Sequence, residues 1–274
     1  MPEGDTLARI ATVLGKALST DQVVAARGRP GGARLDLVVG HHVESVEARG
    51  KHLLIGFSNG LTLHTHLAMN GEWHRYRPGE RWHRSPSRAV AVIETERQVA
   101  VCFDAPTVEL LETRALTVHA RLNRLGPNLA REDFDIEAGL AALRDPSRAA
   151  SAIGDALLDQ RAVAGFGNVY RSELCFLERL SPFTPVAEVP DSTLRRLLER
   201  GAVLVRANSA GGARVTTDHG TPGALNVYGR TGRPCRRCGT VIQSTVVRRE
   251  TPAGGATPRR VYWCPRCQES GKAP

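Results

Sequence analysis

The spacing of apolar residues divides the chain into one helix, a series of short strands and a second, mostly helical region. Residues 5–18 place apolar side chains at helical spacing, with Asp5 or Thr6 as the expected N-cap. The next segments alternate apolar and polar residues, which predicts the strands of a β-sandwich or barrel. These segments cover residues 34–40, 43–48, 52–57, 61–67, 89–95, 99–103 and 108–112. The polar stretch 73–88 is expected to be a loop between two strands.

Helical spacing takes over after residues 125–128, where the alternation stops. Asp133 is the expected cap of a helix that ends at Leu143, and further helices are expected over residues 149–164, 169–180 and 191–206. A Gly-rich segment at 209–224 leads into a short C-terminal module. We therefore predict an α+β, multidomain chain with an N-terminal sandwich domain at 1–125, a helical domain at 126–224 and a small module at 225–274.

Four cysteines near the C-terminus form two CxxC pairs, Cys235 with Cys238 and Cys264 with Cys267. Each pair places two sulfurs on one tight turn, and 25 residues separate the pairs. This spacing predicts a four-cysteine zinc finger with an intervening β-hairpin, in which four thiolates bind one structural Zn²⁺ ion.

The positive charge of the chain is concentrated in the same region. Residues 205–274 contain 12 Lys and Arg against three Asp and Glu, whereas residues 1–204 contain 25 of each sign. A small, metal-bound and arginine-rich module is typical of proteins that contact phosphate backbones. Arg259 and Arg260 precede the apolar run 261–263, and their guanidinium groups suit a phosphate.

The sequence shows neither an apolar run long enough to span a bilayer nor a secretory signal, so we expect a cytoplasmic protein. In that compartment paired cysteines are metal ligands more often than disulfides. Cys102 and Cys175 lie in apolar surroundings in the sequence, which favours a buried packing role over a nucleophilic one.

The N-terminus offers a second candidate chemistry. The chain starts with Met1, Pro2 and Glu3, and removal of Met1 would leave Pro2 with a free secondary amine. An α-amino group has a pKa of about 7.7–8, so part of it is unprotonated at neutral pH. A secondary amine that attacks an aldehyde-like carbon forms a cationic iminium, which acidifies the neighbouring carbon, and Glu3 could transfer protons. Met-Pro starts are nevertheless common, and this signal is weak alone.

Three further positions have both a functional and an ordinary interpretation. Lys51 precedes an apolar strand, where it could contact a phosphate or be an exposed lysine. His64 and His66 alternate on one strand, which favours a hydrogen-bonding role over a metal site. Asn168 ends the turn GFGN between two helices; backbone amides there could bind an anion, or the turn could simply cap the next helix.

Taken together, these motifs resemble the formamidopyrimidine-DNA glycosylase/endonuclease VIII family. The similarity rests on PEGD at residues 2–5, GKH at 50–52, VAGFGNVY at 163–170 and the four-cysteine finger, and it spans residues 2–267. The resemblance implies a helix–two-turn–helix in the helical domain. It also implies a bifunctional DNA glycosylase/AP lyase of base excision repair that excises oxidised bases and leaves a gap through β,δ-elimination.

The resemblance also implies roles for single residues. Pro2 would attack C1′ of the damaged nucleotide and Glu3 would transfer protons. Lys51, counted with the catalytic residues, would hold phosphates beside the extruded nucleotide together with Asn168 and Arg259. Met69 matches the loop that fills the void after base flipping. Asp159 and Glu173 match acidic positions that support the site.

Two departures from the family pattern matter, one in the loops of the sandwich and one in the finger. The formamidopyrimidine branch carries an Arg-Phe-Gly wedge, which residues 103–109 lack, and this favours the endonuclease VIII branch and oxidised pyrimidines. The loop at 68–70 does not match the wedge of that branch well either, and a Gly/Pro-rich insert at 251–258 lengthens the finger. The expected partner is double-stranded or bubble DNA with oxidised bases or abasic sites, bound by a bacterial, nucleoid-associated monomer. The alternatives are an 8-oxoguanine/formamidopyrimidine glycosylase and a non-catalytic zinc-finger damage sensor.

Overall fold

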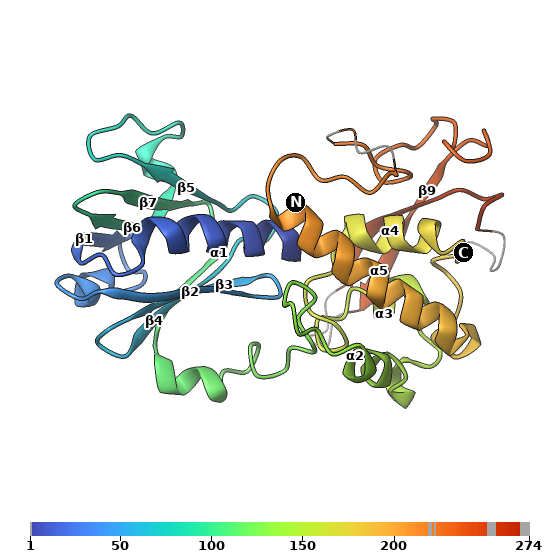
Figure 1. Ribbon diagram of the computed structural model, residues 1–274, viewed down its shortest axis with the longest axis horizontal. Coiled ribbons are helices and arrows are strands. Elements are labelled where there is room, and N and C mark those ends of the chain that lie inside the picture. The colour runs from blue at the N-terminus through green and yellow to red at the C-terminus, as the bar shows by residue number, and fades with distance from the viewer. Residues whose placement is uncertain (1, 219–220, 222, 251–255, 269–274) are drawn as a thin grey trace. The chain divides into compact units, whose positions relative to one another are not determined.

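The computed structural model describes residues 2–218, 221, 223–250 and 256–268. The chain divides into two compact units, Met1–Arg124 and Leu125–Pro274 (Figure 1). The further division of the second unit at residues 224 and 225 stays a prediction from the sequence. No helix among the described residues is both long and apolar enough to cross a membrane.

The first unit combines one long helix with two four-stranded antiparallel sheets (Figure 1). Helix α1 spans Gly4–Leu18. One sheet has the order β2-β3-β4-β8, with strands Val43–Arg49, His52–Phe57, Leu61–His66 and Thr107–Glu112. The other has the order β1-β6-β7-β5, with strands Val23–Gly28, Ala89–Thr95, Val99–Phe103 and Glu72–Tyr76. Short 3-10 turns are η1 (Leu35–Val38), η2 (Pro86–Arg88) and η3 (Thr113–Thr117).

The core of the first unit lies between the two sheets and α1. Leu7 and Leu14 of α1 pack in one buried cluster with Leu53, Ile55 and Leu63 of the first sheet. Side chains alternate across a strand, so the neighbours of these residues on β3 and β4 face the opposite side of the sheet. That opposite side carries the histidines of the two strands.

The structure of this unit differs from the expectations in four places. Residues 35–38 form the 3-10 turn η1 rather than a strand, since Leu35 and Val38 are both buried at a spacing of three. Strand β1 was missed because its burial does not alternate regularly. Strand β5 lies in the stretch expected to be a loop: its buried residues, Trp73 and Tyr76, are three positions apart among polar residues, so the sequence shows no alternation there. The N-cap of α1 is Glu3, not Asp5 or Thr6.

The second unit is helical and ends in a hairpin. Its helices are α2 (Ile136–Leu143), α3 (Ile153–Ala156), α4 (Asn168–Leu177) and α5 (Asp191–Ser209), with 3-10 turns η4 (Pro146–Arg148) and η5 (Val186–Glu188). Strands β9 (Gln243–Glu250) and β10 (Ala256–Trp263) pair antiparallel. A buried cluster that includes Phe166, Tyr170 and Leu174 holds the helices together. Most of the insert at 251–258 lies outside the described residues; its last three residues belong to β10.

Two helix expectations for this unit also need correction. Asp135, not Asp133, caps α2, because its side chain accepts a 2.9 Å hydrogen bond from the Ala138 amide. The long helix expected at 149–164 is a single turn, α3. After it, Asp159 accepts from the Arg161 amide and Gln160 accepts from the Gly165 amide. These side chains offer the backbone partners that compete with a continuing helix.

Candidate functional site

Pro2 and Glu3 lie at the beginning of α1. Pro2 is half-buried, and Glu3 is fully buried and acts as the N-cap, its carbonyl accepting a 3.1 Å hydrogen bond from the Leu7 amide. The helix therefore holds both residues on a rigid support. A pocket of about 290 Å³ adjoins Pro2 and is lined in part by Thr6, Arg9 and Trp73. Its lining combines apolar side chains with charged residues of both signs, including Arg9 and Glu72.

Lys51 lies in the two-residue turn between β2 and β3. Arg49 pairs with His52 across the hairpin, and Gly50 adopts a φ of 58°, which a residue with a side chain seldom tolerates. Burial and then the charge of Lys51 lower the pKa of His66 to about 4, so the ammonium group lies close to that imidazole. The GKH motif thus places a cation at the end of a rigid hairpin.

Met69 lies in the loop between β4 and β5. It is 62% exposed, the highest value among the large apolar residues of that loop and its flanking strands. The preceding Ala68 has a φ of 51°, which is unfavourable for alanine. An apolar side chain presented by a strained loop has the properties expected of a wedge, and this role stays a prediction.

Asn168 and strand β10 are brought together in the second unit. The Asn168 side-chain amide donates a 2.9 Å hydrogen bond to the Arg260 carbonyl, next to Arg259. Arg171, one turn further along α4, is fully buried and donates to the same carbonyl at 3.0 Å and to the Asn168 side-chain oxygen. Asn168 therefore anchors β10 at Arg260, the residue next to Arg259.

Sequence reasoning missed Arg171 altogether. It joins α3 to α4 as well, since it forms a 3.4 Å ion pair with Asp155. Its position three residues after Asn168 is the only signal in the sequence, because residues at that spacing are neighbours on a helix. A lone arginine in a helix is otherwise expected to be exposed.

Glu173 and Asp159 each organise a segment of the second unit. The buried Glu173 carboxylate accepts from the amides of Asn226, Val227 and Tyr228 at 2.8 Å each and from the Thr216 hydroxyl. Asp159 binds two arginines, Arg148 at 2.9 Å and Arg161 at 3.0 Å. Burial acts to raise the pKa of Asp159, but hydrogen bonds from Arg161 and Arg148 lower it to about 2.

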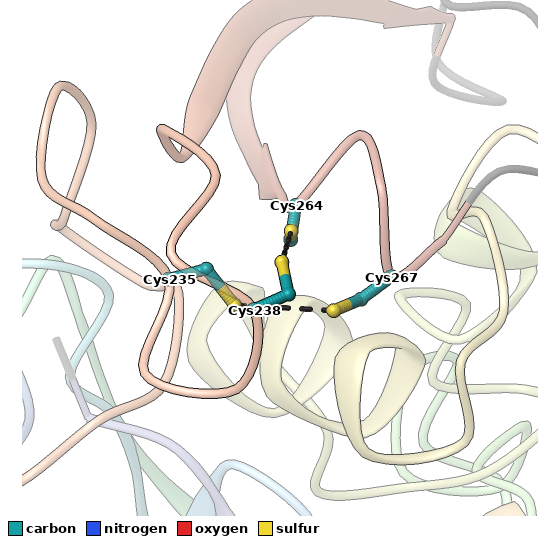
Figure 2. A group of neighbouring side chains, drawn as sticks. All are labelled: Cys235, Cys238, Cys264 and Cys267. Atoms are coloured by element: carbon teal, nitrogen blue, oxygen red, sulfur yellow. Dashed lines mark hydrogen bonds between the residues drawn. The ribbon is translucent and has the colours of Figure 1, made fainter.

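The four cysteines of the C-terminal module meet in space (Figure 2). Their sulfurs all lie within 4.8 Å of one another, with Cys235 and Cys267 3.9 Å apart and Cys238 and Cys264 3.5 Å apart. Zn–S bonds of about 2.3 Å in a tetrahedron require sulfurs roughly 3.8 Å apart. The donor set and its spacing are therefore compatible with one structural Zn²⁺ ion, as predicted.

The cysteine module packs on the helical part of the same unit. Cys235 and Cys264 share a buried cluster with Phe176 of α4, and the Gln268 side chain donates to the Leu180 carbonyl at 2.8 Å. The guanidinium of Arg237 lies 4.3 Å from the centre of the Phe176 ring and donates to the Phe176 carbonyl at 3.1 Å, although the residue is exposed. Zinc would therefore hold β10 and α4 in their mutual arrangement.

The two remaining cysteines are buried, as expected. Cys102 and Cys175 are both fully buried. Burial raises the pKa of the Cys102 thiol far above its usual value and that of Cys175 to about 12. Neither thiol is therefore available as a nucleophile.

Two models of known protein families match the chain. Residues 1–110 match the formamidopyrimidine-DNA glycosylase N-terminal domain, and residues 125–218 match the formamidopyrimidine-DNA glycosylase H2TH domain. Among solved structures, Lactococcus lactis Fpg in complex with DNA containing N7-benzyl-Fapy-dG is similar, with a TM-score of 0.80 and 23% identity over 98% of this chain and 100% of that one. That likeness shows the fold.

Several relatives are similar over nearly their whole length. Probable endonuclease 8 2 of Streptomyces coelicolor is 43% identical over 100% of this chain and 96% of its own. The DNA-(apurinic or apyrimidinic site) lyase Nei2 of Mycolicibacterium smegmatis is 38% identical over 98% and 99%. Endonuclease 8 of Escherichia coli is 30% identical over 98% and 100%. This chain therefore belongs to the formamidopyrimidine-DNA glycosylase/endonuclease VIII family, as its sequence motifs and its fold both indicate.

Proposed function

We propose that this protein is a bifunctional DNA glycosylase/AP lyase that removes oxidised pyrimidines from DNA in the bacterial cytoplasm. The observation that carries the proposal is Pro2 directly before the N-cap of α1, beside a pocket, in a chain that belongs to this family. Relatives that match the full chain bear the names endonuclease 8 and AP lyase.

The reaction starts when removal of Met1 exposes the secondary amine of Pro2. The nitrogen lone pair attacks C1′ of the damaged nucleotide, and the glycosidic bond breaks as the base leaves with the bonding pair and takes up a proton. Opening of the sugar ring, with a proton delivered to its oxygen by Glu3, leaves a cationic iminium between Pro2 and C1′.

The iminium then drives strand cleavage. Its positive charge acidifies C2′, so loss of a C2′ proton expels the 3′ phosphate by β-elimination. A second proton loss expels the 5′ phosphate by δ-elimination, and water finally releases the sugar fragment from Pro2. Each step breaks one C–O bond with the electron pair going to the phosphate, so no external oxidant or reductant is needed.

Binding of the DNA requires groups that contact the phosphates and a side chain that offsets the energetic cost of base flipping. Lys51, Asn168 and Arg259 hold phosphates, and Met69 fills part of the void left by the extruded base. The Zn²⁺ ion has a structural role, because it fixes the two CxxC turns beside β10. The chemical steps are carried out by Pro2 and Glu3.

The oxidised-pyrimidine preference rests on two observations. Residues 103–109 lack the Arg-Phe-Gly wedge of the formamidopyrimidine branch, and the full-length relatives carry the name endonuclease 8. The alternatives remain a formamidopyrimidine-type enzyme for oxidised guanine and a non-catalytic damage sensor.

The test is a lesion panel on defined oligonucleotides, with thymine glycol, 8-oxoguanine and abasic sites, followed by analysis of product ends. We expect faster excision of thymine glycol, phosphate at both gap ends and a borohydride-trapped adduct. Pro2→Gly abolishes the adduct, whereas Pro30→Gly, an exposed turn residue, preserves it. Faster excision of 8-oxoguanine would place the protein in the formamidopyrimidine branch. DNA binding without nicking or trapping would overturn the proposal that the protein is an enzyme. Mass spectrometry of the active protein must show that Met1 is absent.

A further inference from the structure

A cluster of histidines covers the outer side of the sheet β2-β3-β4-β8, and the proposed reaction does not use it. Adjacent strands pair His52 with His66 and His64 with Glu109 directly across the ladder. His119, just after η3, packs against the same group, with its ring 5.2 Å from that of His64. Five titratable side chains from four segments thus meet on one side of the sheet.

Three members of the cluster direct ligand atoms toward one point. His64 Nδ1 lies 2.9 Å from Glu109 Oε2, and His119 Nε2 lies 3.4 Å from the same oxygen. All three atoms lie within 4.8 Å of one another. The His64 side chain is fully buried, whereas that of His119 is 18% exposed and that of Glu109 is 44% exposed. The group is therefore rigid on the inside and open to solvent on one side.

In the metal-free protein, the hydrogen bonds indicate which ring nitrogen of each histidine carries the proton. The Leu122 amide donates to His119 Nδ1 at 3.3 Å, so His119 Nε2 carries the ring proton and donates to Glu109. His64 Nδ1 likewise donates to Glu109, and His64 Nε2 then accepts from His52 Nδ1 at 2.8 Å. Two N–H groups therefore converge on one carboxylate oxygen.

We propose that His64, Glu109 and His119 form a second metal site, specific for a divalent transition ion such as Zn²⁺. Two imidazoles and one carboxylate are the donor set of many open zinc sites, which keep the fourth position for water or another ligand. The ion takes the place of the two protons that now point at Glu109. This inference does not depend on the proposed glycosylase activity.

The surroundings of the site accommodate that exchange. When the metal takes His64 Nδ1, the His64 ring proton moves to Nε2 and donates to His52 Nδ1, and His52 in turn moves its own ring proton from Nδ1 to Nε2. The hydrogen bond from the second nitrogen of His64 then holds the ligating ring in one orientation. At His119 the ring proton moves to Nδ1, and the long Leu122 hydrogen bond is lost. Each imidazole remains neutral, so the exchange requires no net change in the protonation of the rings.

The positive charge of Arg121 opposes binding of a metal ion at this site. Arg121 acts electrostatically on both His52 and His64, and its cation disfavours a second positive charge in the cluster. Its removal should therefore strengthen metal binding. This gives the proposal a gain-of-affinity prediction, which a simple loss of structure cannot imitate.

Metal binding would tie the end of the first unit to its sheet. His119 belongs to the segment that follows η3 and ends the unit at Arg124, whereas His64 and Glu109 belong to the central part of β4 and to β8. A ligand that binds only the folded form stabilises it in proportion to the logarithm of its concentration. Zinc should thus protect this segment from local unfolding.

The experiment measures zinc in the full-length protein with its four-cysteine site filled. The chain is equilibrated with excess Zn²⁺, passed through a desalting column and assayed by mass spectrometry of the metal. We expect a second zinc ion per chain in the unaltered protein and in Glu72→Gln, and loss of that ion in Glu109→Gln and His119→Gln. Glu72 is the matched control because it pairs with one histidine, His74, at 2.8 Å, and the described residues supply no third ligand there.

Cobalt provides an independent readout of the ligands. Co²⁺ in the four-cysteine site gives thiolate charge-transfer absorption, whereas a second Co²⁺ bound by imidazole and carboxylate adds visible bands without it. Arg121→Gln is expected to lower the dissociation constant of the second ion several-fold. A single zinc ion per chain at saturating metal, or a second ion that Glu109→Gln and His119→Gln both retain, overturns the proposal and leaves a hydrogen-bonded cluster only.

Discussion

The Asn168 side-chain amide donates a 2.9 Å hydrogen bond to the backbone carbonyl of Arg260. This contact joins the first residue of α4 to a strand 92 positions further along the chain. It means that Asn168 positions the strand that carries Arg259, whatever else it contacts when DNA is bound. A phosphate contact of Asn168 would use the same amide group or the amides of the helix start.

Asn168→Ala is expected to weaken binding to abasic-site DNA about tenfold, because β10 loses an anchor next to a phosphate-binding arginine. The free energy of unfolding should fall by about 2 kcal/mol, because the buried Arg171 guanidinium loses the Asn168 oxygen as an acceptor but still donates to the Arg260 carbonyl. Fluorescence anisotropy and urea denaturation measure the two effects. Asn59→Ala is the control, because Asn59 also donates to a carbonyl, that of Leu37, at 2.9 Å. Equal affinities for the two variants would contradict the role of Asn168.

Cys264→Ser is expected to release the structural zinc and to weaken DNA binding, while the sandwich unit stays folded. A structural zinc site contributes directly to folding, and Cys264 is buried at the centre of its cluster. Metal analysis and hydrogen exchange of the two units measure the result. Cys175→Ala changes a buried cysteine that is not a ligand, so this control should keep its zinc. Normal zinc content in Cys264→Ser would refute the four-thiolate site.

Met69→Ala is expected to slow base excision from duplex DNA by roughly tenfold, while excision from single strands changes little. In a duplex, extrusion of a base leaves a void in the base stack, and an inserted apolar side chain offsets the lost stacking energy. A single strand has no such void to fill. Stability should change by no more than about 0.5 kcal/mol, because Met69 is 62% exposed. Single-turnover kinetics on matched substrates measure the ratio. Val24→Ala, at an exposed apolar position in β1, is the control. An unchanged duplex-to-single-strand ratio for Met69→Ala would exclude the wedge.

Asp159 should make the stability of the second unit sensitive to acid. Its folded pKa of about 2 lies below the ordinary value of 3.8, so the unfolded state binds a proton first as the pH falls. The carboxylate contributes about 2 kcal/mol of stability above pH 4, which is lost progressively between pH 4 and pH 2.

The variant Asp159→Asn should lack this dependence. Thermal unfolding from pH 2 to pH 6 is expected to show a stability difference between the two proteins that is largest above pH 4 and shrinks toward pH 2. Asp133→Asn is the control, because Asp133 pairs with Arg131 at an exposed position, where ion pairs add little. A difference between Asp159→Asn and the unaltered protein that is constant over the range would contradict the assignment.

The sequence alone determined those elements that can be predicted from a few neighbouring residues. The apolar spacing of α1, the short apolar run of β3, the alternation of β4 and the two CxxC pairs each predict structure from neighbouring residues. The four-cysteine site is the clearest case, because ligand type and spacing together leave few alternatives. The motifs around Pro2 and Asn168 indicated the family for the same reason.

The tertiary structure decided what depends on residues far apart in the chain. The segment after α3 has helical spacing, yet Asp159 and Gln160 draw its backbone into turns, and β5 is a strand only because β7 pairs with it. Arg171 is buried because the Arg260 carbonyl lies beside it. Likewise His64, Glu109 and His119 share no local pattern; strand register and the packing of the segment after η3 bring their ligand atoms together. Burial and long-range hydrogen bonds depend on which segments meet, and no local window contains that information.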